Sequence, residues 1–174
     1  VGLFETMLGV ARDEEHEIVD LAGHLQRLKA SADAMGLAKT LYEDALAETC
    51  LETFRRSGLD RARLRLTITG GDLNLLQASA ETNHRPTVLV TAHPATPYPD
   101  EMFERGVMVT IAEAKANPLD PTASHKTLNY WWRLRELQIA AGKGAAEGLV
   151  FQVSNHLAGG CESNLIAIKD GIAK

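Results

Sequence analysis

A single lysine, Lys126, precedes a strongly patterned apolar segment, and Asn129 and Tyr130 follow it within about one helical turn. An unprotonated lysine amine is a nucleophile toward carbonyl groups and can also act as a general base. A lysine at a strand-to-helix junction is more commonly a solvated charge, because catalytic lysines need burial to lower their pKa. The aromatic neighbours and the positive end of the predicted helix both disfavour the ammonium form, so both interpretations stay open.

The elements that must position this lysine are predicted from apolar periodicity. Spacings of three and four predict helices, whereas alternation or continuous apolar runs predict strands, and Gly36 and Gly58 are typical helix ends. The predicted strands cover residues 2–11, 16–21, 62–71, 86–94, 106–114, 147–154 and 162–171. The predicted helices cover residues 21–35, 41–56 and 126–142. The strand at 86–94 is nearly continuous in its apolarity, so we expect it to be more buried than its neighbours.

This layout predicts an α+β fold, a mixed α/β arrangement in two lobes. A proline-rich stretch separates the lobes, so we predict an N-terminal α/β lobe over residues 1–95, a linker over 96–105 and the start of a larger lobe over 106–174. Val1 begins inside an apolar run, and the chain ends shortly after a strand and a turn. We therefore expect a truncated fragment that lacks both ends of a longer protein.

The composition excludes several classes of protein. The chain has 174 residues, of which 45% are hydrophobic and 24% charged, as in soluble globular proteins. Its net charge of −5 disfavours a nucleic-acid partner, and no window is apolar enough to span a membrane. Cys50 and Cys161 are isolated, which suits a reducing cytoplasm. The glycines form no phosphate loop, and the histidines show no metal-ligand spacing, so we predict no metal site.

Four stretches occur in a specific order along the chain: GLFETM, HLQRLKASA, KTLNY and ESNLIAIKDG. Together they resemble the class IV aminotransferases, the pyridoxal-phosphate enzymes of fold type IV, which include branched-chain and D-amino-acid aminotransferases and aminodeoxychorismate lyase. The resemblance covers essentially the whole chain. It implies that fold, pyridoxal 5'-phosphate as cofactor, an amino acid and a keto acid as substrates, and a homodimer when the protein is full length. The alternative without the family is an α+β domain with a surface lysine.

The resemblance also implies roles for individual residues. Lys126 matches the catalytic lysine that holds the cofactor covalently. Arg27 matches the arginine that contacts the cofactor phosphate, which suits the fork of guanidinium donors, although a solvated arginine off the Leu25 and Leu28 face is the alternative. Tyr130 resembles a tyrosine that some members place near the phenolic oxygen of the cofactor, and a packed aromatic is its alternative.

Three positions depart from the family pattern or differ within it. Gly159 stands where the family has a glutamate that keeps the pyridine nitrogen protonated, so either Glu162 or water replaces that glutamate, or the cofactor is a weaker electron sink. Gly70 stands where D-amino-acid aminotransferases have a carboxylate-binding arginine, which argues against that subtype. Arg65 lies on the strand where branched-chain enzymes carry a substrate-side arginine, and an exposed strand arginine is the alternative.

The function that the resemblance implies is a transaminase that moves an amino group between an amino acid and a 2-keto acid, branched-chain-like rather than of the D-amino-acid type. Lys126 would act first as nucleophile and then as general acid/base. Two alternatives stay open. One is an aminodeoxychorismate lyase, which releases pyruvate and 4-aminobenzoate. The other is a catalytically altered or inactive relative, because Gly159 replaces the glutamate.

Overall fold

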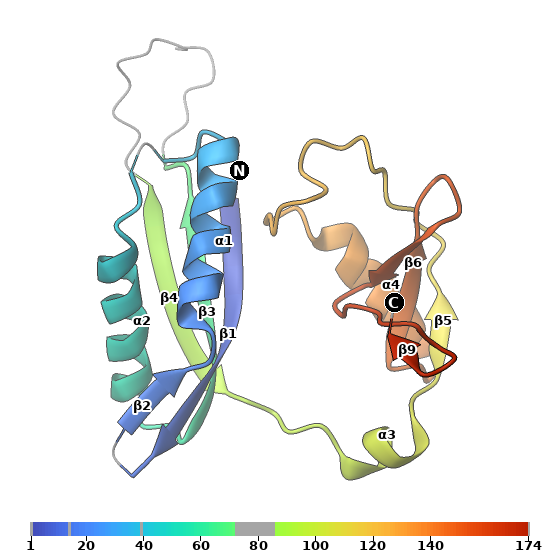
Figure 1. Cartoon of the computed structure of the whole chain (residues 1–174), viewed down its shortest axis with the longest axis horizontal. Coiled ribbons are helices and arrows are strands. Elements are labelled where there is room, and N and C mark those ends of the chain that lie inside the picture. Colours follow the sequence, from blue (N-terminus) through green and yellow to red (C-terminus); the bar gives the residue numbers. More distant parts are fainter. Residues whose placement is uncertain (1, 14, 39, 72–85, 174) are drawn as a thin grey trace. The chain divides into compact units, whose positions relative to one another are not determined.

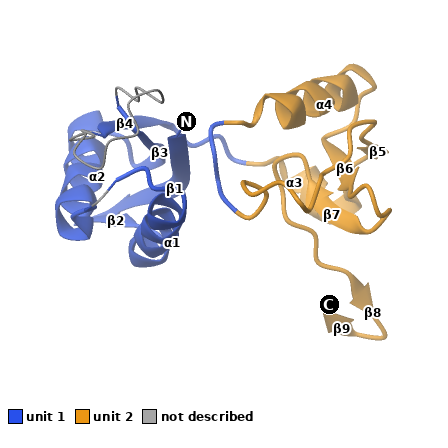
Figure 2. Cartoon of the chain, turned by 90° about the horizontal axis from the view of Figure 1, so that it is seen from above, with its two compact units in different colours: residues 1–97, 125–128 blue, residues 98–124, 129–174 orange. Residues whose placement is uncertain are grey.

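The computed structural model describes residues 2–13, 15–38, 40–71 and 86–173 (Figure 1). They form two compact units, the first made of residues 1–97 and 125–128 and the second of residues 98–124 and 129–174 (Figure 2). Residues 125–128, which the sequence pattern groups with the second lobe, cluster with the first unit. The mixture of helices and strands confirms the predicted α+β class.

The first unit is built on a four-stranded antiparallel sheet with the order β2-β1-β3-β4. Its strands are β1 (Gly2–Arg12), β2 (Glu15–Ile18), β3 (Arg61–Thr69) and β4 (Thr87–Pro94). The strands predicted over 2–11 and 16–21 form an antiparallel hairpin, in which Gly9 pairs with Ile18 and Arg12 with Glu15. The alternation predicted for β3 is also confirmed, with Leu64 fully buried.

Strand β4 was predicted to be buried, and this prediction is wrong. β4 pairs with β3 on one side and is the last strand of the sheet. Val88 and Leu89 are 41% and 56% exposed in the chain. An apolar run does not distinguish a strand that is covered on both faces from an edge strand, which has a hydrogen-bonded neighbour on one side only.

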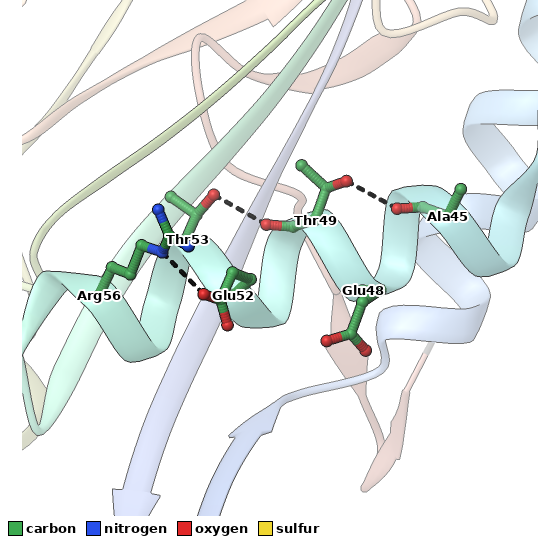
Figure 3. Close-up of a pocket in the computed structure, with 6 residues that line it drawn as sticks. All are labelled: Ala45, Glu48, Thr49, Glu52, Thr53 and Arg56. Atoms are coloured by element: carbon green, nitrogen blue, oxygen red, sulfur yellow. Dashed lines mark hydrogen bonds and ion pairs between the residues drawn. The ribbon is translucent and has the colours of Figure 1, made fainter.

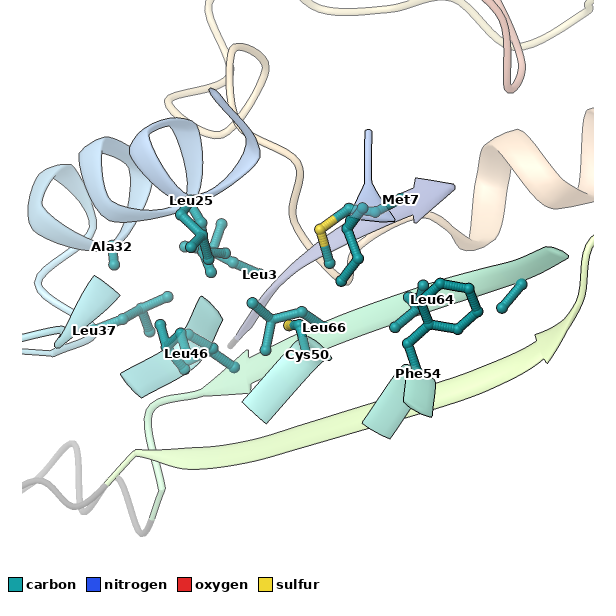
Figure 4. Packing of buried hydrophobic residues seen from close by; sticks show 14 residues of the cluster. Leu3, Met7, Leu25, Ala32, Leu37, Leu46, Cys50, Phe54, Leu64 and Leu66 are labelled. Carbon is teal, nitrogen blue, oxygen red and sulfur yellow. The ribbon is translucent and has the colours of Figure 1, made fainter. Parts of the chain in front are cut away.

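Two helices cover one face of this sheet, α1 (Leu21–Ala34) and α2 (Glu43–Ser57). Leucines and other apolar residues at helical spacing point inward, and Gly58 ends α2 in the left-handed conformation (φ 65°). Figure 4 shows the resulting core, to which Leu25 of α1, Phe54 of α2 and Leu66 of the sheet all belong. The helix predicted over 41–56 begins two residues late, since Tyr42 precedes α2 as its N-cap and is 73% exposed.

The second unit contains a βαβ arrangement. Strand β5 (Val109–Ile111) pairs in parallel with β6 (Glu147–Phe151), and β6 pairs antiparallel with β7 (Leu157–Gly160). Parallel neighbours need a crossover, which contains helix α4 (Trp131–Gly142). The remaining elements are α3 (Asp100–Arg105), β8 (Ile168–Lys169) and β9 (Ile172–Ala173). Among the described helices, none has the length and apolarity to cross a membrane.

Two predicted elements of the second unit are wrong in extent. The helix predicted over 126–142 begins only at Trp131, because residues 125–128 are extended and belong to the first unit. The strand predicted over 162–171 is reduced to the two residues of β8. In both cases the apolar pattern correctly predicted ordered segments. It did not predict at which residue the helix begins or how short the strand is.

Candidate active site

Lys126 is held by the edge of strand β1. The N–H of Phe4 donates to the carbonyl of Lys126 (3.0 Å), and the N–H of Leu128 donates to the carbonyl of Gly2 (2.9 Å). The two bonds flank an antiparallel bridge between Leu3 and Thr127. The lysine therefore lies in a short strand-like segment, so the helix N-terminus that was expected to favour its unprotonated amine begins five residues later, at Trp131.

A second contact anchors the same segment to helix α1. The Nδ1 atom of His125 lies 3.0 Å from the Oγ of Ser31, which is 5% exposed. Backbone bonds to β1 and this side-chain contact to α1 fix the backbone on both sides of Lys126. A lysine whose backbone is fixed in this way loses less conformational freedom when its amine is used for binding or chemistry.

The aromatic ring of Phe4 brings two of the predicted site residues together. The Nζ of Lys126 lies 4.6 Å from the ring centroid, and the guanidinium carbon of Arg65 lies 3.8 Å from it. Phe4 is only 4% exposed, so both cation–π contacts are partly shielded from water. Burial, and then the charge of Arg63, lower the pKa of Arg65. The ring thus brings the amine of Lys126 and the guanidinium of Arg65 into one small region.

Arg27 is paired with a buried glutamate that the sequence interpretation missed. Glu5 is 1% exposed, and its carboxylate accepts bonds from Nε and Nη2 of Arg27 at 2.7 and 2.5 Å. The Nδ1 of His24 lies 2.8 Å from the same carboxylate. Burial alone would raise the pKa of Glu5, but the bonds from Arg27 and His24 outweigh it, so this pKa is lowered. The bond to Glu5 in turn raises the pKa of Arg27.

Arg27 and Lys126 contact opposite sides of β1. Their partners, Glu5 and Phe4, are consecutive in the strand, and consecutive strand residues point to opposite faces. Arg27 is nevertheless half exposed, and among the described residues its bonds use Nε and Nη2. Nη1 therefore has the capacity to donate to an anion such as a phosphate.

The other predicted residues belong to the second unit. Tyr130 is the N-cap residue of α4, and its ring centroid lies 5.8 Å from the guanidinium carbon of Arg133. Gly159 lies in β7 with φ 147°, a backbone conformation that favours glycine. Glu162 has an exposed side chain, and its N–H donates to Glu147 (3.3 Å).

Glu147 is the second carboxylate that the sequence interpretation missed. It accepts bonds from the N–H groups of Gly148, Cys161, Glu162 and Ser163 and from the hydroxyl of Ser163. Burial alone would raise the pKa of Glu147, but these bonds, the Ser163 hydroxyl first, outweigh it and lower the pKa. A glutamate within an apolar strand, as for Glu5, or at the start of one, as for Glu147, is the sequence signal that could have identified these residues.

A surface pocket on helix α2 does not contain any of these residues. Figure 3 shows its lining, which comes from a single helix: Ala45, Glu48, Thr49, Glu52, Thr53 and Arg56. The hydroxyls of Thr49 and Thr53 donate to carbonyls of their own helix, and Glu52 pairs with Arg56. Its polar groups are therefore engaged with their own helix, and none of the predicted site residues lines this pocket.

Comparison with known proteins identifies relatives of the chain. A family model described as amino-transferase class IV matches residues 2–173. The branched-chain-amino-acid aminotransferase of Escherichia coli (strain K12) is 29% identical over 152 residues, which are 86% of this chain and 49% of that protein. The chain spans about half the length of the curated relatives it matches.

Solved structures share the fold. The crystal structure of the E. coli branched-chain aminotransferase matches with a TM-score of 0.86 and 24% identity, covering 99% of this chain and 57% of that one. A putative 4-amino-4-deoxychorismate lyase from Legionella pneumophila matches with a TM-score of 0.81 and 21% identity, over 99% and 60%. The T.th. branched-chain aminotransferase with pyridoxamine 5'-phosphate has a TM-score of 0.83 and 21% identity, over 99% and 56%. At these identities the similarity shows the fold alone.

Proposed function

The chain belongs to the amino-transferase class IV family, and from this premise we propose that the whole protein is a pyridoxal-phosphate-dependent transaminase. It would move an amino group between an amino acid and a 2-keto acid, with branched-chain-like rather than D-amino-acid substrates. The single observation that carries the proposal is the pair of cations on the Phe4 ring, with the Nζ of Lys126 at 4.6 Å and the guanidinium of Arg65 at 3.8 Å.

The chemistry of the side chains fits the cofactor of this family. Lys126 provides a half-buried primary amine, which is the group that binds an aldehyde covalently. Arg27 contacts the other side of β1, so the cofactor would have to extend around the edge of this strand for its phosphate to reach Nη1 of Arg27. Glu5 keeps the guanidinium in a fixed orientation. We also assign cofactor contacts to Tyr130, Gly159 and Glu162, because the resemblance to the family implies them. When bound, the cofactor supplies the electron sink that amino-acid chemistry requires.

Lys126 has two tasks in this proposal. Its Nζ holds the cofactor as a nucleophile, and the same amine then moves a proton as general acid and base. Arg65 binds the carboxylate of the substrate, because a guanidinium offers two parallel N–H donors to a carboxylate. The Phe4 ring orients both groups and excludes water from one side of each.

A second candidate is a catalytically altered relative, and Gly159 favours it. A glutamate at this position would have to adopt φ 147°, which side-chain-bearing residues rarely do. Because residue 159 is a glycine, it supplies no carboxylate to the pyridine nitrogen of the cofactor. The two candidates differ in outcome, because a transaminase turns over amino donors, whereas an inactive relative binds the cofactor without turnover.

The test is an absorption spectrum of the intact protein with added pyridoxal phosphate, with Lys126→Ala and Lys29→Ala alongside. Lys29 is a matched control, because it is a surface lysine of α1 paired with Asp33. We expect a cofactor band that Lys126→Ala abolishes and Lys29→Ala leaves unchanged, and turnover about a thousandfold lower in Lys126→Ala.

Substrate assays then separate the candidates. Turnover of an amino donor that depends on an added 2-keto acid supports the transaminase, and pyruvate release without an acceptor identifies a lyase. A band without any turnover identifies the altered relative. The absence of a band from the intact protein would reject the cofactor and the proposed reaction together.

A further inference from the structure

The turn that follows β7 wraps around a carboxylate of its own chain. Oε1 of Glu147 accepts from the N–H of Cys161 (3.0 Å), and Oε2 accepts from the N–H of Glu162 (3.3 Å) and Ser163 (3.1 Å). The hydroxyl of Ser163 donates to Oε2 as well (2.8 Å), and the N–H of Gly148 donates to Oε1 (2.8 Å). Three consecutive backbone N–H groups thus converge on one anion, as in the anion-binding concavities that backbone amides form elsewhere.

Gly160 makes this close approach possible. A Cβ at this position would lie 2.8 Å from Oε2 of Glu147 and would collide with the Oγ of Ser163. The N–H of Gly160 donates to the carbonyl of Ser163 (2.9 Å), which closes the turn. Its own carbonyl accepts from Nη1 of Arg133 on α4 (2.8 Å). A carboxylate from β6 and a guanidinium from α4 therefore fix the same turn.

The charge of Glu147 matters for this arrangement. Hydrogen bonds from N–H groups to a carboxylate are shorter and stronger than those to a neutral acceptor. A glutamine would fit the same space, but its NH₂ group cannot accept a hydrogen bond. The donors that now bond to Oε1, or those that bond to Oε2, would therefore lose their acceptor. The geometry of the turn thus depends on a side chain that does not belong to it.

We propose that Glu147 is a positioning residue of the active site, which sets the backbone of residues 159–163. The inference rests on the proposed function, because Gly159 precedes the fixed turn, Glu162 lies within it, and both are assigned there to the cofactor. Glu147 itself bonds only to the turn and to Gly148 among the described contacts, so it acts on the cofactor through the turn.

The test is Glu147→Gln in the intact protein, with Glu52→Gln as a control for loss of one negative charge. Glu52 pairs with Arg56 on the surface of α2, in the first unit. Three quantities are measured: amide hydrogen exchange of residues 160–163, the affinity of the protein for pyridoxal phosphate, and the pH titration of the absorption band of the bound cofactor. We expect about tenfold faster exchange and about tenfold weaker cofactor binding in Glu147→Gln, the size that one charge-assisted hydrogen bond gives.

The midpoint of the band's pH titration should shift in Glu147→Gln and stay in place in Glu52→Gln. Ser163→Ala removes one of the five bonds and should change all three quantities in the same direction by less, so the proposal stays testable if the glutamine variant does not fold. Faster exchange with an unchanged titration and cofactor affinity would make Glu147 a purely structural residue and overturn the proposal. A wild-type protein without any cofactor band would instead reject the proposed function, and the positioning role with it.

Discussion

Glu5 in the first unit and Glu147 in the second are both carboxylates enclosed by hydrogen bonds, and both have a lowered pKa. They differ in what surrounds them. Glu5 is 1% exposed and is matched by two side chains of α1, Arg27 and His24. Glu147 is matched by four backbone N–H groups and one hydroxyl.

This difference determines which substitutions disrupt the hydrogen bonds of each carboxylate. A side-chain cation can be removed by a single substitution, which leaves the buried carboxylate without a counter-charge. Backbone donors are present whatever the side chains are, so the second site is disturbed by changing the acceptor or by blocking its approach. The first site therefore depends on a side-chain counter-charge, whereas the second depends on the charge of its acceptor and on the close approach that Gly160 allows.

The largest effect should follow removal of the counter-charge from Glu5. Arg27→Ala should lower the free energy of unfolding by about 3 kcal/mol, the low end for a broken buried ion pair, because water reaches the half-exposed guanidinium. Urea unfolding of the intact protein at neutral pH measures this loss. Lys29→Ala, on the same helix in a surface pair with Asp33, should leave the urea midpoint almost unchanged.

The double variant Arg27→Ala with Glu5→Met sharpens the interpretation. It removes both charges, so it should recover a large part of the stability that Arg27→Ala loses. If the double variant is less stable than Arg27→Ala alone, the damage comes from lost packing of the arginine and not from the unpaired carboxylate.

An intermediate effect should follow a change of shape at the second site. Gly160→Ala should lower the free energy of unfolding by about 2 kcal/mol, because its Cβ meets Glu147 and Ser163 in a closed turn. Thermal and urea unfolding of the intact protein measure the loss. Gly142→Ala is the matched control, since a Cβ at this last residue of α4 meets nothing within 4 Å. A gain of about 0.5 kcal/mol is expected there, and equal losses in both variants would contradict the close approach at Gly160.

The smallest effect should appear in the pH dependence of stability. Both carboxylates have a pKa below their ordinary value of 4.5 in the folded protein. Their contribution to stability is therefore complete above that value and is lost as the pH falls through the lowered pKa values. Urea unfolding between about pH 6 and pH 3 should show stability falling with pH, less steeply in Glu147→Gln than in the wild type. Stability that rises as the pH falls would contradict both assignments.

The helices and the central strand of the first unit were predictable because local spacing determines them. Leu25 and Phe54 lie on helical faces, and Leu64 on a strand face, whose periods can be read directly from the sequence. Strand β4 was mispredicted because its exposure depends on its position at the sheet edge, which is a property of the topology. Local periodicity carries no information about which strand is last.

The candidate site was predictable only in its parts. Motif resemblance singled out Lys126, Arg27 and Arg65, and two of them meet at the Phe4 ring. The roles of Glu5 and Glu147 were missed, because each depends on partners that come close only after folding. The extended conformation of Lys126 was missed for the same reason, since its hydrogen bonds go to β1 at the other end of the first unit's sequence.

The return of residues 125–128 to β1 also fixes an order of events during synthesis. The first unit has nearly all of its chain once residue 97 has been made, yet the N–H of Phe4 and the carbonyl of Gly2 receive their partners only from Lys126 and Leu128. Contacts between segments so distant in sequence form late, because loop closure must precede them. The nascent protein therefore carries an open sheet edge until Lys126 arrives, and the residue proposed to do the chemistry is also the one that closes that edge.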